Sequence, residues 1–294
     1  IVARGAGTGL SGGAVAIEPG IIVSLTRMDR VLQVNERDRT ALVEPGLVNL
    51  DLSTHVKDRK LFFAPDPSSQ KASTIGVNIA ENAGGPHCLK YGVTTNHILG
   101  VEVVLPNGNV VWMDSNQAGF GGLDLTAAIV GSEGMFGIVT RALVKLTPIP
   151  DSISVMLAAF HSMDDAAQAV TEIIASGTMP ASLEIMDSLS MQAVEAAYHA
   201  GYPTEAAAVL LVEVDGHPLE VAEISAEVEA LCRRIGVAQY RQSYDPVEQA
   251  ALWMGRKMSL AAMGRLAPNY YLQDAVVPRS KLVQTLDEVA RLSK

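Results

Sequence analysis

The chain has 294 residues, a length typical of two domains of about 150 residues each. Its hydrophobic fraction of 48% and charged fraction of 18% exclude disorder for the bulk of it. The 22 basic and 32 acidic residues give a net charge of −10 without a basic run, so no nucleic-acid partner is expected. No apolar run reaches the ~18 residues of a membrane span, and we expect no transmembrane segment.

Two cysteines, Cys88 and Cys232, are too few for a disulfide framework, a zinc site or an iron–sulfur cluster. No signal peptide is visible, so we expect a cytoplasmic protein. The chain opens on a strand-like segment, residues 1–4, without an initiating Met. We therefore expect the natural protein to be longer.

Glycine divides the chain, because 19 of its 25 glycines lie in residues 1–150. Pro148 and Pro150 end a strand-like run and predict a boundary between a domain at 1–149 and one at 150–294. In the first domain, strands are predicted at 20–25, 31–34, 40–43, 99–105, 109–113 and 138–146, and helices at 48–59, 74–80 and 123–130. Residues 106–108 predict a tight hairpin turn.

The second domain alternates strands and helices. Strands are predicted at 154–160, 182–186, 208–214, 237–242 and 270–276, and helices at 164–176, 188–199, 219–235, 246–264 and 278–292. Such alternation is typical of a sheet covered by helices. The predicted fold class is α+β, with a glycine-rich first domain and an α/β second domain.

Residues 4–13 contain five glycines, and Gly7, Gly9 and Gly12 match the spacing of a dinucleotide fingerprint with Asp29 at the expected distance. The dinucleotide-binding fold with this fingerprint needs a helix directly after the third glycine. Only six residues separate Gly12 from Pro19, too few for a helix of about ten residues. A phosphate P-loop is excluded because no Gly-Lys-Ser/Thr follows. The segment is predicted to be a long loop between strands whose amides form an anion nest; the alternative is a flexible surface loop.

Two further clusters of small residues follow, at 65–92 and at 131–140. Their glycines, hydroxyls and amides suit a backbone that lies against a flat ring and a pyrophosphate. In this order the three clusters resemble the vanillyl-alcohol oxidase (PCMH-type) FAD-binding domain of the FAD-linked 2-hydroxy-acid dehydrogenases. Residues 181–187, 252–257 and 270–278 are similar to the substrate-side cap of that family, above all in the FAD subunits of bacterial glycolate oxidases.

The resemblance implies non-covalent FAD. Residues 4–13 and 74–76 would hold the pyrophosphate, residues 82–85 and 91–92 would lie near the flavin, and residues 133–139 near the adenosine half. The implied cofactor-binding residues are Arg4, Gly5, Ala6, Gly7, Thr8, Gly9, Ser11, Gly12, Pro65, Ser73, Thr74, Gly76, Asn82, Gly84, Gly85, Tyr91, Gly92, Glu133, Gly134, Gly137, Ile138 and Val139. Members of the family also carry a preceding segment and a later His-rich stretch, so parts of both domains are expected outside the chain.

The activity implied is oxidation of a small D-2-hydroxy acid, glycolate to glyoxylate first, by hydride transfer to flavin N5. D-Lactate oxidation and a flavin-holding, non-catalytic subunit of an oxidase complex are the alternatives. An iron–sulfur electron-transfer subunit is the implied partner, with membrane association through partner subunits. The general base is expected beyond Lys294.

Three other features have competing interpretations. The six histidines show no metal-ligand spacing, and no metal site is predicted among them; His87 either lies near the flavin ring or makes an ordinary hydrogen bond. Cys88 is interpreted as a buried thiol rather than a flavin thioether. Arg256 lies three residues after Trp253, on the same helical face. It is predicted to bind the substrate carboxylate, and the alternative is a solvated charge beside Lys257.

Overall fold

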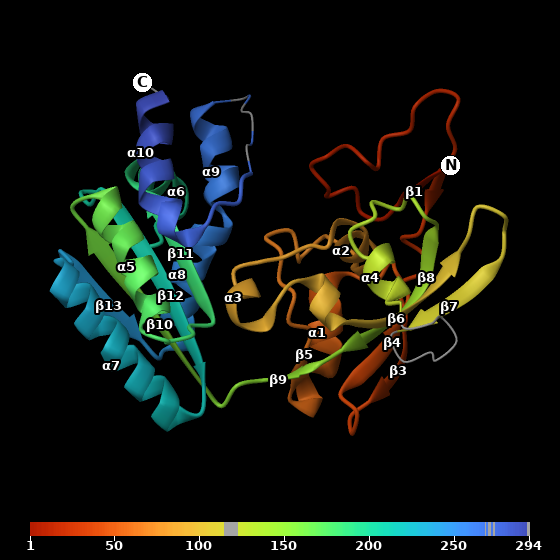
Figure 1. The fold of residues 1–294 in the computed structure, drawn as a ribbon, viewed down its shortest axis with the longest axis horizontal. Coiled ribbons are helices and arrows are strands. Elements are labelled where there is room, and N and C mark those ends of the chain that lie inside the picture. Colours follow the sequence, from red (N-terminus) through yellow and green to blue (C-terminus); the bar gives the residue numbers. More distant parts are fainter. Residues whose placement is uncertain (115–122, 268, 270–271, 273, 293–294) are drawn as a thin grey trace. The chain divides into compact units, whose positions relative to one another are not determined.

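The structure is a computed structural model that describes residues 1–114, 123–267, 269, 272 and 274–292. The chain divides into two compact units, Ile1–Ile149 and Pro150–Lys294. In Figure 1 the first unit runs from red to yellow-green and the second from green to blue. Each unit is described by itself.

A five-stranded antiparallel sheet forms the frame of the first unit. Its order is β3 (Val31–Asn35), β4 (Thr40–Val43), β8 (Ile138–Lys145), β6 (Ile98–Val104) and β7 (Val110–Asp114). All five strands lie where the apolar runs predict them. Gly108, with a φ of 84°, closes the predicted turn between β6 and β7.

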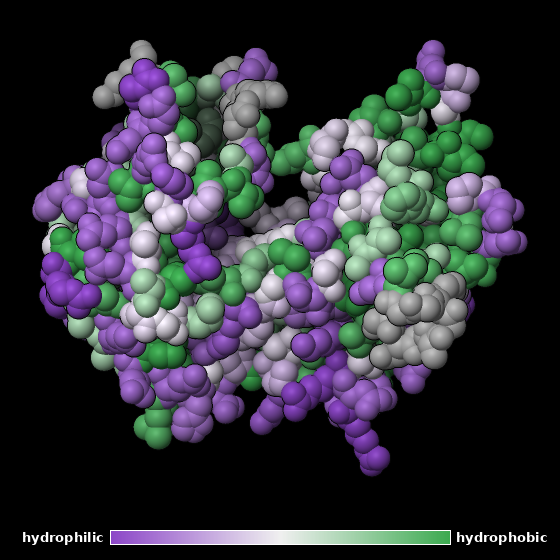
Figure 2. All heavy atoms as spheres, in the orientation of Figure 1, coloured by the Kyte–Doolittle hydropathy of each residue, from purple (hydrophilic) through white to green (hydrophobic). Residues whose placement is uncertain are grey.

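A separate two-stranded parallel sheet pairs β1 (Val2–Arg4) with β2 (Ile22–Ser24). The residues between these strands are all described and contain no helix, which confirms that the glycine spacing is not a dinucleotide fingerprint. Several apolar side chains are exposed here, among them Ile1, Val15, Ile17 and Ile21. Figure 2 shows hydrophobic residues gathered over this part of the unit.

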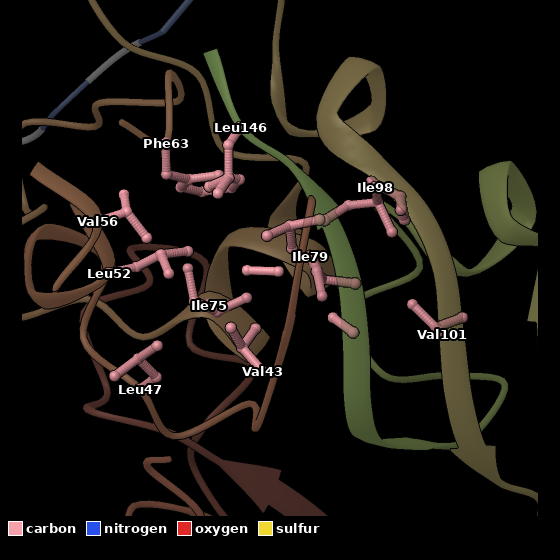
Figure 3. Close-up of a cluster of buried hydrophobic side chains, with 14 of the residues drawn as sticks. Val43, Leu47, Leu52, Val56, Phe63, Ile75, Ile79, Ile98, Val101 and Leu146 are labelled. Carbon is pink, nitrogen blue, oxygen red and sulfur yellow. The ribbon is translucent and has the colours of Figure 1, made fainter. Parts of the chain in front are cut away.

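Helices α1 (Asn49–Val56), α2 (Ile75–Glu81) and α4 (Leu125–Ile129) cover one face of the five-stranded sheet. Figure 3 shows Leu52 and Val56 of α1 and Ile75 and Ile79 of α2 in one buried cluster with sheet residues. The shorter elements are η1 (Lys57–Arg59), α3 (Cys88–Tyr91), η2 (Thr94–His97) and the paired strands β5 (Leu61–Phe62) and β9 (Thr147–Pro148). This packing fixes α2, whose start and end both carry predicted site residues.

The second unit is an antiparallel sheet with helices on both faces. Its order is β11 (Ser182–Asp187), β12 (Ala208–Gly216), β10 (Ser152–Phe160) and β13 (Gln239–Ser243). Alternate residues of β10 point to opposite cores. One core contains α6 (Ser188–Tyr198), α8 (Pro246–Lys257) and α9 (Ser259–Leu266), and the other contains α5 (Met163–Ala175) and α7 (Pro218–Ile235). The predicted helix-covered sheet is confirmed.

Three predicted elements differ from the structure. The helix predicted at 246–264 is two helices, α8 and α9, because the backbone of Met258 (φ −95°, ψ 2°) ends the first of them. The strand predicted at 270–276 is wrong for residues 272 and 274–276, which are in no strand, while residues 270, 271 and 273 lie outside the described residues. The helix predicted at 278–292 begins as η3 (Arg279–Lys281) and continues as α10 (Leu282–Leu292).

Candidate functional site

A cleft of about 220 Å³ lies in the first unit. Its walls are the glycine loop after β1, the first residues of α2 and the segment that leads into β8. The glycine loop is the first cluster of small residues, the start of α2 belongs to the second cluster, and the segment before β8 belongs to the third. The fold therefore brings together stretches of sequence that lie more than 50 residues apart.

The glycine loop offers a row of free backbone donors. In the part of the chain that the structure describes, the N–H groups of residues 5–14 donate no hydrogen bond to a protein acceptor. Gly7 and Gly12 have φ values of 72° and 82°, a conformation that turns successive amides toward one side. Unpaired N–H groups on a concave loop favour an anionic ligand.

The glycine loop lies directly on the start of α2. A Cβ at Gly5 would lie 2.4 Å from Thr74 Oγ1 and 2.7 Å from Val77 Cγ2, so the backbone approach requires glycine. Thr74 is 2% exposed, and its hydroxyl has no hydrogen-bond partner among the described residues. A buried hydroxyl without a partner, beside a loop of unpaired amides, fits an additional polar ligand in the cleft.

The third cluster is bound to the end of α2. The N–H groups of Gly131 and Glu133 donate to the carbonyls of Ile79 and Ala80, each at 2.8 Å. Gly131, Glu133 and Gly134 all have positive φ values, which curls the segment back over the helix. A Cβ at Gly137 would lie 2.6 Å from the carbonyl oxygen of Val104. The position of this wall is therefore fixed by backbone contacts that need small residues.

Two carboxylates, Glu81 and Glu133, also line the cleft. Burial raises the pKa of the Glu81 carboxyl, and the nearby Glu133 raises it further, while a hydrogen bond with Ser11 opposes the shift. A carboxyl group that keeps its proton is a hydrogen-bond donor as well as an acceptor. The lining also includes apolar side chains, with Leu25, Met135 and Ile138 among them. The cleft thus combines a loop of unpaired amides with apolar lining residues.

Half of the 22 predicted cofactor-binding residues line this cleft. They are Arg4, Gly5, Gly7, Gly9, Thr74, Gly76, Glu133, Gly134, Gly137, Ile138 and Val139. The other eleven are outside its lining; Ala6, Thr8, Ser11 and Gly12 belong to the same loop. The sequence interpretation missed Glu81, although it is the only charged residue in the small-residue stretch 73–85.

One of the predicted flavin-side residues, Gly85, lies directly against Asp66. A Cβ at Gly85 would lie 2.3 Å from the Asp66 carbonyl oxygen, and His87 Nδ1 lies 2.8 Å from Asp66 Oδ2. Cys88 Sγ accepts a hydrogen bond from the Gly85 N–H. Cys88 is half-buried, so the interpretation of its thiol as fully buried is wrong. These contacts hold the turn at Gly85 against Asp66.

The short helix η2 holds the same turn from its other side. Thr94 Oγ1 donates to the Ala83 carbonyl at 2.6 Å, and the Thr95 N–H donates to Asn82 Oδ1 at 2.9 Å. His97 Nε2 lies 2.9 Å from the Tyr91 carbonyl oxygen, which only accepts, so this nitrogen carries the proton. Burial lowers the pKa of His97, which is therefore neutral. Asn82 and Tyr91 are both fixed by hydrogen bonds to η2.

Arg256 lies in the second unit, near the end of α8. Its side chain is 28% exposed, and Nε and Nη2 each lie 2.8 Å from Glu184 Oε2 on β11. Trp253, on the same helical face, is buried and donates its indole N–H to Glu213. Arg256 is thus partly buried and ion-paired, rather than a fully solvated charge. The described residues contain no group of three potential metal ligands and no helix that is long and apolar enough to cross a membrane.

Comparison with known proteins matches both units. The family model of the FAD binding domain matches residues 1–114, and that of the C-terminal domain of FAD linked oxidases matches residues 149–294. Glycolate oxidase subunit GlcD of Escherichia coli K12 is 45% identical over all of this chain and 59% of its own length. The Bacillus subtilis protein of that name is 42% identical over 99% of this chain and 63% of its own. A probable mitochondrial D-lactate dehydrogenase of Danio rerio is 30% identical over 98% of this chain and 58% of its own length.

The chain therefore spans about three fifths of the length of the curated relatives that it matches. A solved structure of alkyldihydroxyacetonephosphate synthase superposes with a TM-score of 0.80 at 20% identity, covering 99% of this chain and 60% of its own, which shows a shared fold. The unpaired loop amides, the Thr74 hydroxyl and the glycine contacts fit the cofactor of these families. The chain belongs to the FAD-linked oxidases, in which an FAD binding domain precedes the C-terminal domain of that family, and FAD is its cofactor.

Proposed function

We propose that this protein oxidises a small D-2-hydroxy acid, with glycolate converted to glyoxylate as the preferred reaction. The row of unpaired amides at residues 5–14, in the loop that lines the cleft beside Thr74, is the observation that carries the proposal. It supports a cofactor with a pyrophosphate in this unit. The 45% identity to glycolate oxidase subunit GlcD favours glycolate as substrate.

We assign FAD binding to residues 1–149. The loop residues Arg4 to Gly12 and the Thr74–Gly76 turn bind the pyrophosphate in this assignment, and Glu133 to Val139 contact the adenosine half. Asn82, Gly84, Gly85, Tyr91 and Gly92 face the flavin in this assignment, and Pro65 and Ser73 are further cofactor-binding residues. Their support is the hydrogen-bonded cluster around Asp66 and η2, which would hold a flat ring's edge in one place.

We assign substrate binding to residues 150–294, with Arg256 on the substrate carboxylate. FAD, when bound, supplies the acceptor for the two electrons and the carbon-bound hydrogen that the hydroxy acid loses. A 2-hydroxy acid is ionised at neutral pH, and a guanidinium matches its two carboxylate oxygens with parallel hydrogen bonds. Arg256 is partly buried, so such a pair would be screened less than one at the surface.

D-Lactate is the second candidate substrate, because D-lactate dehydrogenases of Danio rerio and Anaerostipes hadrus are 30% and 29% identical to the chain. GlcD is named as a subunit, and we propose that an iron–sulfur partner takes the electrons here, with any membrane association made through such partners.

The test is anaerobic mixing of the FAD-loaded full-length protein, which is expected to include the general base beyond Lys294, with glycolate, D-lactate and L-lactate. We expect the yellow flavin absorbance to bleach with glycolate most rapidly, then D-lactate, and not with L-lactate. Faster bleaching by D-lactate would make it a D-lactate dehydrogenase. Flavin that stays oxidised with every acid would support the non-catalytic, flavin-holding subunit and refute the proposal.

A further inference from the structure

Arg256 has two edges that can each hold a carboxylate. A guanidinium presents Nε–H and Nη2–H along one edge and Nη1–H and Nη2–H along its end, in one rigid plane. Glu184 occupies the first edge, with Nε and Nη2 both at 2.8 Å from the same oxygen, Oε2. Among the described residues, no acceptor is bonded to Nη1, which forms that end together with the second N–H of Nη2.

Glu184 is itself held in place. It lies in the middle of β11, directly opposite Leu211 of β12, and its side chain is 19% exposed. A residue in the middle of a paired strand has a fixed backbone, and the flanking Ser182 and Met186 on its face of the sheet are buried. The carboxylate therefore gives Arg256 a fixed reference point, 72 residues away in the sequence.

The backbone of Arg256 is fixed from the other side by Tyr202. The Tyr202 hydroxyl donates to the Leu252 carbonyl at 2.5 Å, one helical turn before Arg256. A Cβ at Gly255 would lie 2.9 Å from the Tyr202 ring, so the ring packs directly against the backbone of α8. Burial raises the pKa of the Tyr202 hydroxyl, which is therefore neutral and able to donate, although the charge and the backbone N–H of Arg256 oppose the shift.

We infer that Glu184 is a positioning residue that occupies one edge of the Arg256 guanidinium and so directs the other edge toward the substrate carboxylate. This inference rests on the proposed function, since it takes Arg256 as the carboxylate-binding residue. The Glu184 charge also cancels much of the positive charge of Arg256. Binding then depends on the match between the free edge and a planar carboxylate, which disfavours anions that cannot make two parallel bonds.

The test compares Glu184→Gln with a matched control, Glu229→Gln, which removes an Arg–Glu pair on α7. Both are measured in the FAD-loaded protein, by calorimetric titration with oxalate, a two-carbon carboxylate that cannot be oxidised in this reaction, and by kcat and KM for glycolate. We expect Glu184→Gln to raise the oxalate Kd and the glycolate KM about three- to tenfold, with kcat within about twofold, because an unheld guanidinium must be ordered when the ligand binds. Glu229→Gln should change neither constant.

Arg256→Ala, alone and combined with Glu184→Gln, separates the inference from the proposed function. If Glu184 acts through Arg256, its substitution should add less than about twofold in the Arg256→Ala background. If Glu184→Gln leaves the oxalate Kd unchanged or lowers it while Arg256→Ala raises it, the positioning role of Glu184 is refuted. The carboxylate-binding role of Arg256 then stands. An unchanged oxalate Kd in Arg256→Ala refutes the carboxylate-binding role of Arg256. If Glu184→Gln fails to fold, Glu184→Asp, which keeps the charge but retracts it, should show a smaller rise of the same kind, and no rise refutes the role.

Discussion

Replacing Gly5 by alanine should weaken FAD binding, because the new methyl group has no room at the floor of the cleft. Its Cβ would lie 2.4 Å from Thr74 Oγ1 and 2.7 Å from Val77 Cγ2, both well inside van der Waals contact. Gly5 does not have a positive φ, so backbone strain is not the cause. Overpacking of this kind costs about 1–3 kcal/mol. If the loop must move away from α2 to relieve it, the Kd for FAD rises about 5- to 150-fold.

Gly13→Ala is the matched control for Gly5→Ala. Gly13 lies in the same loop and also lines the cleft, but the nearest atom to its added Cβ is Glu133 Oε2 at an ordinary 3.9 Å. Fluorescence titration of the apoprotein with FAD gives both constants, and thermal unfolding of the apoproteins reports any general loss of stability. A Gly5→Ala Kd within about twofold of the unsubstituted protein, or an equal rise in both variants, would refute the role given to the contact between the loop and α2.

Three other changes test separate parts of the site. Acid precipitation should release all flavin into the supernatant, because Thr8 in the glycine loop cannot form a histidyl link to the flavin, and yellow colour in the pellet would contradict this. FAD affinity should fall as the pH rises through the raised pKa of Glu81, because the carboxyl group then loses its proton and repels the pyrophosphate; Glu81→Gln should flatten the titration curve. Arg256→Ala should raise the glycolate KM at least tenfold with an unchanged FAD spectrum, because charged hydrogen bonds contribute about 1.5–3 kcal/mol, and Arg256→Lys should recover only part of the loss.

The elements of both units were largely predictable from apolar periodicity. The hairpin at Gly108 and the absence of a helix after Gly12 also follow from local rules, since turn chemistry and the minimum length of a helix are properties of short segments. The break at Met258 was not predictable, because the apolar pattern of α8 continues across it into α9. The apolar run before Pro278 resembles a strand, but no strand among the described residues pairs with it.

The site was predictable in part, because some of its features are visible in short segments of the sequence. Clusters of small residues mark a backbone that something approaches closely, which pointed to the loop at Gly5 and to Gly137. Glu184 carries no such signal, because its pairing with Arg256 joins a strand to a helix 72 residues away and exists only in the folded unit. The unpaired hydroxyl of Thr74 is likewise visible only once its surroundings are known.

Hydrogen exchange, measured by mass spectrometry with and without FAD, tests the cofactor site most directly. The amides of residues 5–14 have no protein acceptor among the described residues, so they should exchange rapidly in the apoprotein. We expect saturating FAD to protect this loop and residues 132–139 more strongly than any peptide of the second unit's α7. Bound FAD that leaves the exchange of residues 5–14 unchanged would contradict the assignment of the pyrophosphate to this cleft.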